Sequence, residues 1–295
     1  MFRIAALAGL VACALGPLSS PSPIDQSRRV DLEAADCSDI NMTMGDYETA
    51  RAAQRGTVPA SVGTLEVRPD SNGGVRIERG TGATYSITAC IAAGARTRAE
   101  AQAAADSVRL VIEGNRVRAA RMDTSRASNW SVQIIVSAPD GSSIDAETSN
   151  GPIGVKGVSG TFVLRATNGP IALDDVNGTV QARASNGPIS VASGRGQFDV
   201  ETSNGPISVR LDGQRWDGHL DARAQNGPLT LTLPPNYQSG VEVSSSDHSP
   251  WNCRAEACRT GNRDWDDRSR SIRIGADPVV VKLSTVNGPV TINER

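Results

Sequence analysis

The sequence predicts an all-β chain that folds as a right-handed parallel β-solenoid with coils of ~18 residues, preceded by a small section of strands and one helix. The tripeptide Asn-Gly-Pro occurs six times, and the first four copies begin 18 residues apart. Aliphatic residues recur at fixed positions in each repeat, and aromatic residues make up only 3% of the chain, which fits a thin core. The six Asn-Gly pairs are Asn150 and Gly151, Asn168 and Gly169, Asn186 and Gly187, Asn204 and Gly205, Asn226 and Gly227, and Asn287 and Gly288.

Each repeat contains two short segments with apolar residues at alternate positions. After the second tripeptide, Ile171 and Leu173 form one such segment, and Val180 and Ala182 belong to the next. A period of two predicts a strand with one buried face, so each repeat supplies two strands.

The tripeptides predict corners rather than hairpins. Asn-Gly between strands normally favours a two-residue turn, but the following Pro has no N–H to close it. We therefore expect like positions to stack as parallel strands roughly 4.8 Å apart, with a right-handed crossover. Gly then supplies backbone freedom at the corner, and the Asn side chains hydrogen-bond along it as a ladder. A propeller or sandwich is the alternative, although 18 residues are too few for a four-stranded blade.

Residues 1–20 predict an export signal. Arg3 precedes the apolar run from Ile4 to Leu18, which is too short to span a bilayer permanently. The run contains a small-residue cleavage pattern around Cys13, and the same residues resemble a bacterial lipoprotein signal that would place a lipid anchor on Cys13. Either way we expect an exported protein of the periplasm or cell surface.

The remaining four cysteines predict disulfides. An even number of cysteines in an exported chain favours pairing, here Cys253 with Cys258 and Cys37 with Cys90. Free thiols are the alternative, and a zinc site is disfavoured because only one close pair exists.

Composition along the chain predicts four segments. After the signal, residues 21–60 are expected to be loosely ordered. Residues 61–131 combine strands with one helix over 97–107, and their first two strands form either a hairpin or the first coil edges. Residues 132–295 carry the solenoid repeats, interrupted by a disulfide-containing loop at 245–270.

The inserted loop is the candidate ligand site. Insertions in solenoids lie on one face and often carry binding roles. This one holds Trp251, Trp265 and His248. The two tryptophans either stack on sugar rings or form the loop's own small core over the disulfide.

Other surface features have structural alternatives. The outward position of the first strand of each repeat is always small, which predicts a flat strip for a partner, a glycan or the chain's own helix; its residues are Gly154, Ala172, Ser190, Ser208, Thr230 and Thr291. Arg165, Arg183 and Arg223 share an outward row that either binds acidic polysaccharide or is a solvated mixed face. A bare terminal coil after Ile292 would offer pairing groups to another chain.

No feature predicts catalysis, a cofactor or a metal. Asp174 with Asp175, and the aspartates at 264–267, lack the spacing of known calcium loops. The net charge of −2 gives no expectation of nucleic-acid binding. The enzymatic alternative is a polysaccharide lyase-like solenoid, which would need a base among carboxylates in one groove.

Residues 132–155 (VQIIVSAPDGSSIDAETSNGPIGV), together with the repeated Asn-Gly corner, resemble the bacterial putative adhesin families of the DUF4097 type. The resemblance implies an exported β-solenoid without a shared catalytic motif. It therefore implies a non-catalytic adhesin-like binding module or structural scaffold of the cell envelope, with a glycan or an envelope protein as partner. It does not predict an oligomeric state.

Overall fold

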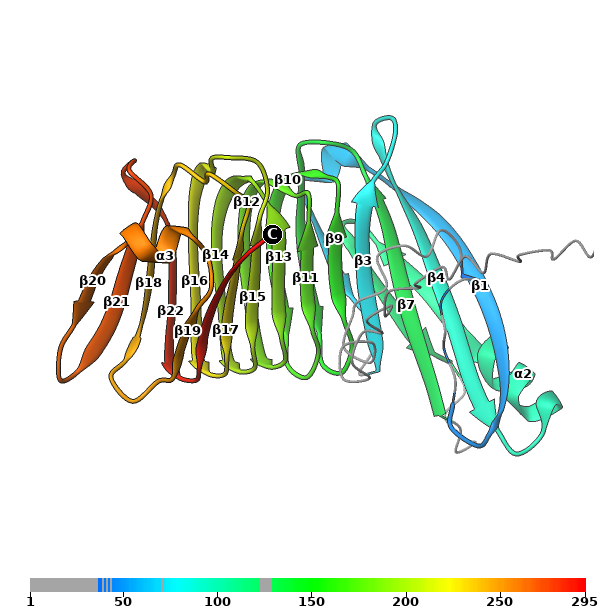
Figure 1. Ribbon diagram of the computed structural model, residues 1–295. Coiled ribbons are helices and arrows are strands. Elements are labelled where there is room, and N and C mark those ends of the chain that lie inside the picture. The colour runs from blue at the N-terminus through cyan, green and yellow to red at the C-terminus, as the bar shows by residue number, and fades with distance from the viewer. Residues whose placement is uncertain (1–36, 39, 41, 43, 70–71, 123–128) are drawn as a thin grey trace, which may run out of the picture.

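The computed structural model describes residues 37, 38, 40, 42, 44–69, 72–122 and 129–295. The predicted signal and Cys13 lie outside these residues. The strands form an 11-stranded sheet, called sheet I, and a 12-stranded sheet, called sheet II. Figure 1 shows the two sheets running side by side along the length of the molecule. The prediction of a nearly all-β chain with long parallel sheets is confirmed.

Successive repeat strands alternate between the two sheets. In sheet II they are β8 (Ser142–Thr148), β10 (Ser159–Ala166), β12 (Asn177–Asn186), β14 (Arg195–Asn204) and β16 (Asp217–Asn226). In sheet I they are β9 (Ile153–Lys156), β11 (Ile171–Asp174), β13 (Ile189–Ser193), β15 (Ile207–Leu211) and β17 (Leu229–Leu233). We call one strand of sheet II, its corner and the following strand of sheet I a rung.

Neighbouring rungs pair in parallel and in the register of the repeat. Phe162 pairs with Val180, and Val180 pairs with Phe198, so like positions of successive repeats lie side by side. The alternate residues of each strand point between the sheets, where Phe162 and Phe198 are fully buried. In the longer fourth repeat, Trp216 extends this core and packs edge-on against Phe198 at a centroid distance of 5.4 Å.

The corners require glycine because the backbone of the neighbouring rung lies too close for a side chain, and not because of the glycines' own backbone angles. We expected them to supply conformational freedom, but none of the six has a positive φ. Instead, a Cβ atom on Gly187 would lie 2.1 Å from the carbonyl oxygen of Gly169, and the other corners are equally tight. Positive φ occurs nine residues after a corner glycine, at Gly178 (107°) and Gly196 (110°).

The corner asparagines form a hydrogen-bonded ladder. Asn168 Nδ2 donates to Asn150 Oδ1 at 3.0 Å, and the same contact repeats at 2.9–3.1 Å through Asn186, Asn204, Asn226 and Asn287. From Asn168 to Asn226, each side chain therefore donates to the rung before it and accepts from the rung after it, and Asn287 donates at the end of the ladder, which fixes the corners in one line.

At the carboxyl-terminal end, the order of rungs in space differs from their order in the chain. The last rung, β22 (Val279–Asn287) with β23 (Val290–Glu294), lies between β16–β17 and the rung of β18 (Gly240–Ser246) with β19 (Trp251–Cys253). Ile292 is therefore paired on both sides, by Leu231 and Cys253. The expected bare edge after Ile292 is wrong, because the earlier β18–β19 rung covers it.

The amino-terminal end is arranged in the same way. The rung of β2 (Thr64–Arg68) with β3 (Gly73–Arg79) lies between β8–β9 and the rung of β6 (Arg116–Arg121) with β7 (Asn129–Ala138). Because β2 and β3 belong to different sheets, the hairpin alternative is wrong and they are coil edges. Strand β5 (Val108–Glu113) forms an antiparallel hairpin with β6 and ends sheet II.

Sheet I ends in two long antiparallel strands, β1 (Glu48–Pro59) and β4 (Thr84–Ala95). A short 3-10 turn, η1 (Ala60–Val62), follows β1. The expectation of loose order over 21–60 is therefore wrong for β1, which pairs along its whole length although its Ala- and Arg-rich sequence lacks clear alternation. Helix α2 (Arg98–Ser107) has the predicted capping box of Thr97 and Glu100, and it packs on β1 and β4 rather than on the strip of small residues.

Candidate functional site

Residues 245–270 form a folded cap, not the loop that we expected. Strands β18 and β19 complete the outermost rung, and α3 (Ala257–Thr260), β20 (Asn262–Trp265) and β21 (Ser269–Ile274) follow. Strand β21 pairs antiparallel with β18 and with β20, and buries Ile272 and Ile274 against the core. Burial of these apolar residues of β21 therefore holds the preceding polar segment against the end of the stack (Figure 1).

Two disulfides brace the ends of the molecule. Cys253 of β19 bonds to Cys258 of α3, with their Cα atoms 6.1 Å apart. At the other end, Cys37 bonds to Cys90 of β4, with a Cα separation of 5.2 Å. The pairing is the one the sequence predicts, and the first bridge fixes the position of β19 beside the short helix.

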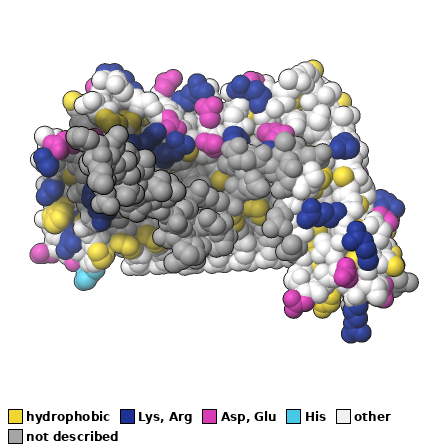
Figure 2. All heavy atoms as spheres, turned by 45° about the vertical axis from the view of Figure 1, so that its right-hand side comes forward, with side chains coloured by type: hydrophobic (Ala, Val, Ile, Leu, Met, Phe, Trp, Pro, Cys, Tyr) yellow, Lys and Arg dark blue, Asp and Glu magenta, His cyan; other side chains and the backbone are white. Residues whose placement is uncertain are grey.

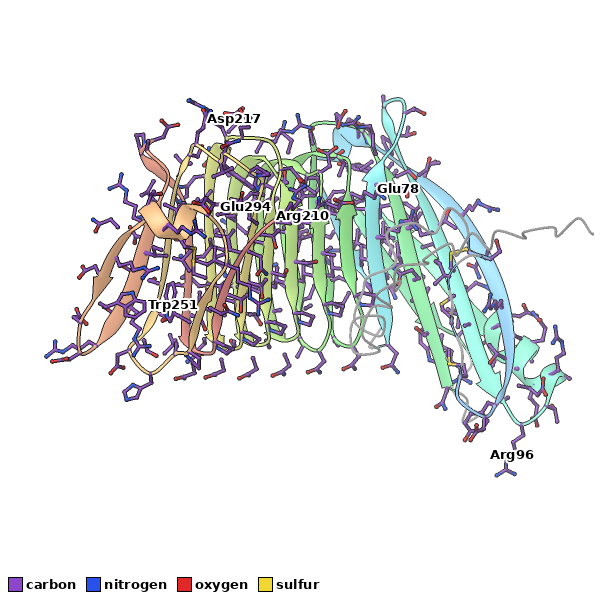
Figure 3. The ribbon with its side chains drawn as sticks, viewed as in Figure 1. Glu78, Arg96, Arg210, Asp217, Trp251 and Glu294 are labelled. Carbon is purple, nitrogen blue, oxygen red and sulfur yellow. A yellow bond between two sulfur atoms is a disulfide. The ribbon has the colours of Figure 1, made fainter. Side chains whose placement is uncertain are left out.

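A small aromatic pocket lies in the cap. It has a volume of about 220 Å³ and is lined by Trp251, Cys253, Arg263, Trp265 and Ile272. The two indole rings are 6.2 Å apart between centroids and tilted by 49°. Figure 3 shows Trp251 among the strands near the end of the stack.

The two tryptophans differ in their freedom. Trp251 is half-buried, and its indole Nε1 donates to Ser245 Oγ at 2.7 Å, which fixes the ring. Trp265 lies on the edge strand β20 and is 52% exposed. The pocket thus has one anchored aromatic wall and one wall open to solvent.

Two guanidinium groups lie over the Trp265 ring. The Cζ atoms of Arg270 and Arg263 are 5.2 Å and 5.9 Å from its centroid, within the range of cation–π attraction. Each guanidinium also donates a hydrogen bond to a backbone carbonyl, Arg263 to Cys258 O and Arg270 to Ser249 O, both at 3.2 Å.

His248 does not join the tryptophans. Its side chain is 90% exposed, its Nδ1 contacts Asp247, and it does not line the pocket. Sequence reasoning brought the two tryptophans into one site but missed Arg263 and Arg270. Their positions carried a signal, because Arg263 precedes Trp265 by two residues and Arg270 follows the polar turn that returns the chain to it.

The arginine row on sheet II is internally neutralised. Arg183 and Arg223 both bond to Asp199 at 2.6 Å, and Arg165 pairs with Asp145 at 3.1 Å. Basic and acidic side chains are also interspersed along the upper edge of the molecule in the view of Figure 2. These contacts favour the solvated mixed face over a site for acidic polysaccharide.

The aspartate pairs considered for calcium have other partners. Asp175 pairs with Arg195 at 3.1 Å, and Asp174 lies 3.7 Å from Arg210. Asp266 accepts from the backbone N–H groups of Arg268 and Ser269 at 2.7 Å, which lowers its pKa below the usual range. Within the described ranges, no three His, Cys, Asp or Glu side chains are grouped as metal ligands.

A second hollow lies near the amino-terminal end. It has a volume of about 720 Å³, and its lining includes Met44, Tyr47, Asn72 and Trp130. In the part of the chain that the structure describes, no helix is long and apolar enough to cross a membrane.

Comparison with known proteins gives only distant similarities. No family model matches the chain, and no curated protein matches it. Among solved structures, a putative cell adhesion protein from Clostridium sporogenes is 9% identical, with 83% of this chain and 100% of that chain covered and a TM-score of 0.32. A putative adhesin from Bacteroides fragilis is 10% identical, with coverages of 83% and 97% and a TM-score of 0.40.

A putative lipid binding protein from Parabacteroides distasonis is similarly distant. It is 11% identical, with 83% of this chain and 96% of that chain covered and a TM-score of 0.31. Identities and TM-scores in this range give no argument about function, so the function must be inferred from the site itself.

Proposed function

We propose that this chain is a non-catalytic exported protein of the cell envelope, an adhesin-like binding module of the DUF4097 type. In this proposal the right-handed solenoid of ~18-residue coils is the scaffold, and the carboxyl-terminal cap binds a saccharide. The observation that carries the proposal is the pair of indole rings, 6.2 Å apart, in a pocket at the end of the stack.

Paired indole rings suit a sugar because of the chemistry of both surfaces. One face of a pyranose ring presents C–H groups, while its edge presents hydroxyl groups. An indole offers a large flat apolar face with a negative quadrupole that attracts such C–H groups. The half-exposed Trp265 supplies a face that an incoming ring can cover, and the anchored Trp251 supplies a second wall.

The cap holds this pocket in place before any ligand arrives. The Cys253–Cys258 disulfide fixes β19, the Ser245 hydrogen bond fixes Trp251, and β21 joins the hairpin to the stack. Fixed side chains lose little conformational entropy on binding, which raises affinity for a given contact area.

Export is supported by the two disulfides, since such bonds persist in oxidising compartments outside the cytoplasm. The cleaved signal and the lipid anchor at Cys13 remain proposals about residues outside the described structure. An envelope protein as ligand, and a purely structural role, are the outcomes against which the saccharide proposal is tested.

A glycan array with the secreted, disulfide-intact protein tests the proposal. We expect binding to a defined set of saccharides, lowered at least about tenfold by Trp265→Ala, which corresponds to ~1.4 kcal/mol. The matched control is Tyr47→Ala, because Tyr47 is an aromatic residue of similar exposure, 49%, at the other end of the molecule. It should leave binding unchanged.

Three results would contradict the proposal. Absence of any hit, or hits that survive Trp265→Ala but disappear with Tyr47→Ala, would remove the cap as the binding site. Ultraviolet-absorbing unsaturated products formed from an acidic polysaccharide would instead establish the polysaccharide lyase alternative.

A further inference from the structure

We infer that the cap pocket is specific for sugars that carry a carboxylate, with Arg263 and Arg270 as the groups that recognise the charge. This inference rests on the proposed saccharide function and names the class of saccharide. A hexuronate residue within an oligosaccharide has the required combination, a ring face for Trp265 and a planar anion for the two guanidinium groups.

Arg263 and Arg270 lack the carboxylate partners that the arginines of the central rungs have, and among the described arginines of the cap only Arg259 has such a partner, Glu256. On the faces of the central rungs each arginine has an ion pair with an Asp or Glu; these arginines are Arg165, Arg183, Arg195, Arg210 and Arg223. In the cap, several arginines have no ion pair with any described residue; they are Arg254, Arg263, Arg268, Arg270 and Arg273.

The side chains of the β20–β21 hairpin divide between two faces, and both arginines lie on the face of the pocket. Arg263 pairs with Ile272, and Trp265 pairs with Arg270, so these four side chains share one face of the β20–β21 hairpin. Asp264 alternates with them and points to the opposite face. The pocket face of the hairpin therefore carries two positive charges and no negative charge of its own strands.

The aspartates of the hairpin turn do not neutralise this pair. Asp266 accepts from the backbone of Arg268 and Ser269 and from the Ser269 hydroxyl, so it is engaged in closing the turn. Neither Asp266 nor its neighbour Asp267 forms an ion pair or a hydrogen bond with Arg263 or Arg270. The positive charge beside the pocket is therefore available to a ligand.

The geometry of the two guanidinium groups favours a carboxylate. Each is held over the Trp265 ring and also donates to a backbone carbonyl, which limits its orientation. A guanidinium held in this way has N–H groups left to form paired hydrogen bonds with the two oxygens of a carboxylate. The weakly hydrated, ring-stacked cation also loses less solvation than an ammonium group would.

The size of the pocket limits the ligand to a single recognised ring. Its volume of about 220 Å³ lies below the range of roughly 300–1,000 Å³ that is typical of sites for drug-sized ligands. The contact therefore involves one uronate residue, terminal or along a longer chain, and specificity must come from the charge rather than from an extended groove.

Calorimetric titration of the secreted full chain tests the inference. The probes are a glucuronate-containing tetrasaccharide, the same tetrasaccharide with its carboxyl groups reduced to hydroxymethyl groups, and a sulfated tetrasaccharide without carboxylates. We expect the carboxylated probe to bind at least about tenfold more tightly than either of the others, and its affinity to fall as salt is raised.

Substitutions locate the charge recognition. The double variant Arg263→Gln with Arg270→Gln should bind the carboxylated and the reduced probe with about equal affinity. Weak binding of both probes through the tryptophans should remain. Arg254→Gln is the matched control, because Arg254 is an arginine of the same cap without an ion pair but does not line the pocket. It should keep the preference, and thermal unfolding should show that all variants are folded.

The outcomes separate the inference from the proposed function. Equal binding of the carboxylated and reduced probes, lost with Trp265→Ala, would overturn carboxylate recognition and leave the saccharide site standing. A preference for the sulfated probe would also overturn it. Binding of none of the three probes, with no hit on the glycan array, would remove both, and a protein ligand found instead would do the same.

Discussion

The tight stacking of the corner glycines leads to a prediction about stability, for which Gly187→Ala is the most informative change. A Cβ atom at this position would lie 2.1 Å from Gly169 O, whereas real Cβ contacts are not shorter than 3.0 Å. The two rungs would have to separate locally by the difference, 3.0 − 2.1 = 0.9 Å. The same displacement would act on the hydrogen bonds that join these rungs at the corner.

The hydrogen bonds that would lengthen determine how much stability is lost. Ile171 N donates to Pro188 O at 2.9 Å, and Asn186 Nδ2 donates to Asn168 Oδ1 at 3.0 Å. Lengthening either by 0.9 Å would take it beyond hydrogen-bond distance. Losing one or two bonds at about 1 kcal/mol each, together with overpacking of about 1–3 kcal/mol, gives a loss of roughly 2–5 kcal/mol in the free energy of unfolding.

Urea unfolding followed by circular dichroism measures this loss, and Ser190→Ala is the control on the same rung. Ser190 is exposed on the outer face of β13, so its substitution should change the free energy of unfolding by less than about 0.5 kcal/mol. If Gly187→Ala were as mild as Ser190→Ala, the reasoning from close approach would be refuted.

Three further predictions concern the ends of the stack and a buried phenol. Ile292→Ala should lower the free energy of unfolding by about 2–4 kcal/mol, because Ile292 is fully buried between two rungs. Thr291 points outward, so Thr291→Ala should change the free energy of unfolding little. Equal effects of the two substitutions in urea unfolding would contradict the inserted position of β23. Replacing Cys253 and Cys258 by Ser should speed proteolytic cleavage within 254–270 while the sheets keep their circular dichroism spectrum, and unchanged cleavage would show that the bridge does not hold the cap. Burial raises the pKa of Tyr237 to about 12, so the folded protein keeps the phenol proton at pH values where the unfolded chain, with a pKa near 10, loses it. The free energy of unfolding should therefore fall as pH rises from about 10 to 12. Tyr237→Phe should remove this part of the fall when unfolding is measured at alkaline pH.

The period of the repeat allowed strand pairing to be predicted residue by residue. Identical units that stack in parallel must bring Val180 beside Phe198, and the structure has this register. The corner glycines were expected to supply backbone freedom, and that reason was wrong. A sequence pattern shows that no side chain is tolerated, but only coordinates distinguish a backbone angle from a neighbouring carbonyl oxygen.

The order of the end rungs could not be predicted from the period, because β18–β19 and β22–β23 both carry apolar alternation. A physical difference between them does exist. The β22–β23 corner contains Asn287 and extends the asparagine ladder from Asn226, whereas the β18–β19 corner at 247–250 has no Asn-Gly pair. The rung that continues the ladder takes the inner place, and the rung without it takes the end.

The candidate site was only partly predictable for a similar reason. The two tryptophans were conspicuous in a polar segment, and a short disulfide loop was expected to bring them together. The positions of Arg263 and Arg270 depend on the antiparallel register of β20 with β21, which the sequence does not state. Strand β1 was missed because its pairing with β4, rather than its own pattern, makes it a strand.

The most direct test of the arrangement that builds the cap is an engineered cross-link between β17 and β23. Thr230 and Thr291 are register partners on these parallel strands, and Thr291 is also the partner of Asn252 in β19. Neighbouring strands lie about 4.8 Å apart, a separation that suits a disulfide. Oxidation of the Thr230→Cys, Thr291→Cys variant should give a bridge between the two new cysteines in peptide mapping by mass spectrometry, and the Thr230→Cys, Asn252→Cys variant should give none. The opposite pattern would place β19 directly beside β17 and contradict the inserted final rung.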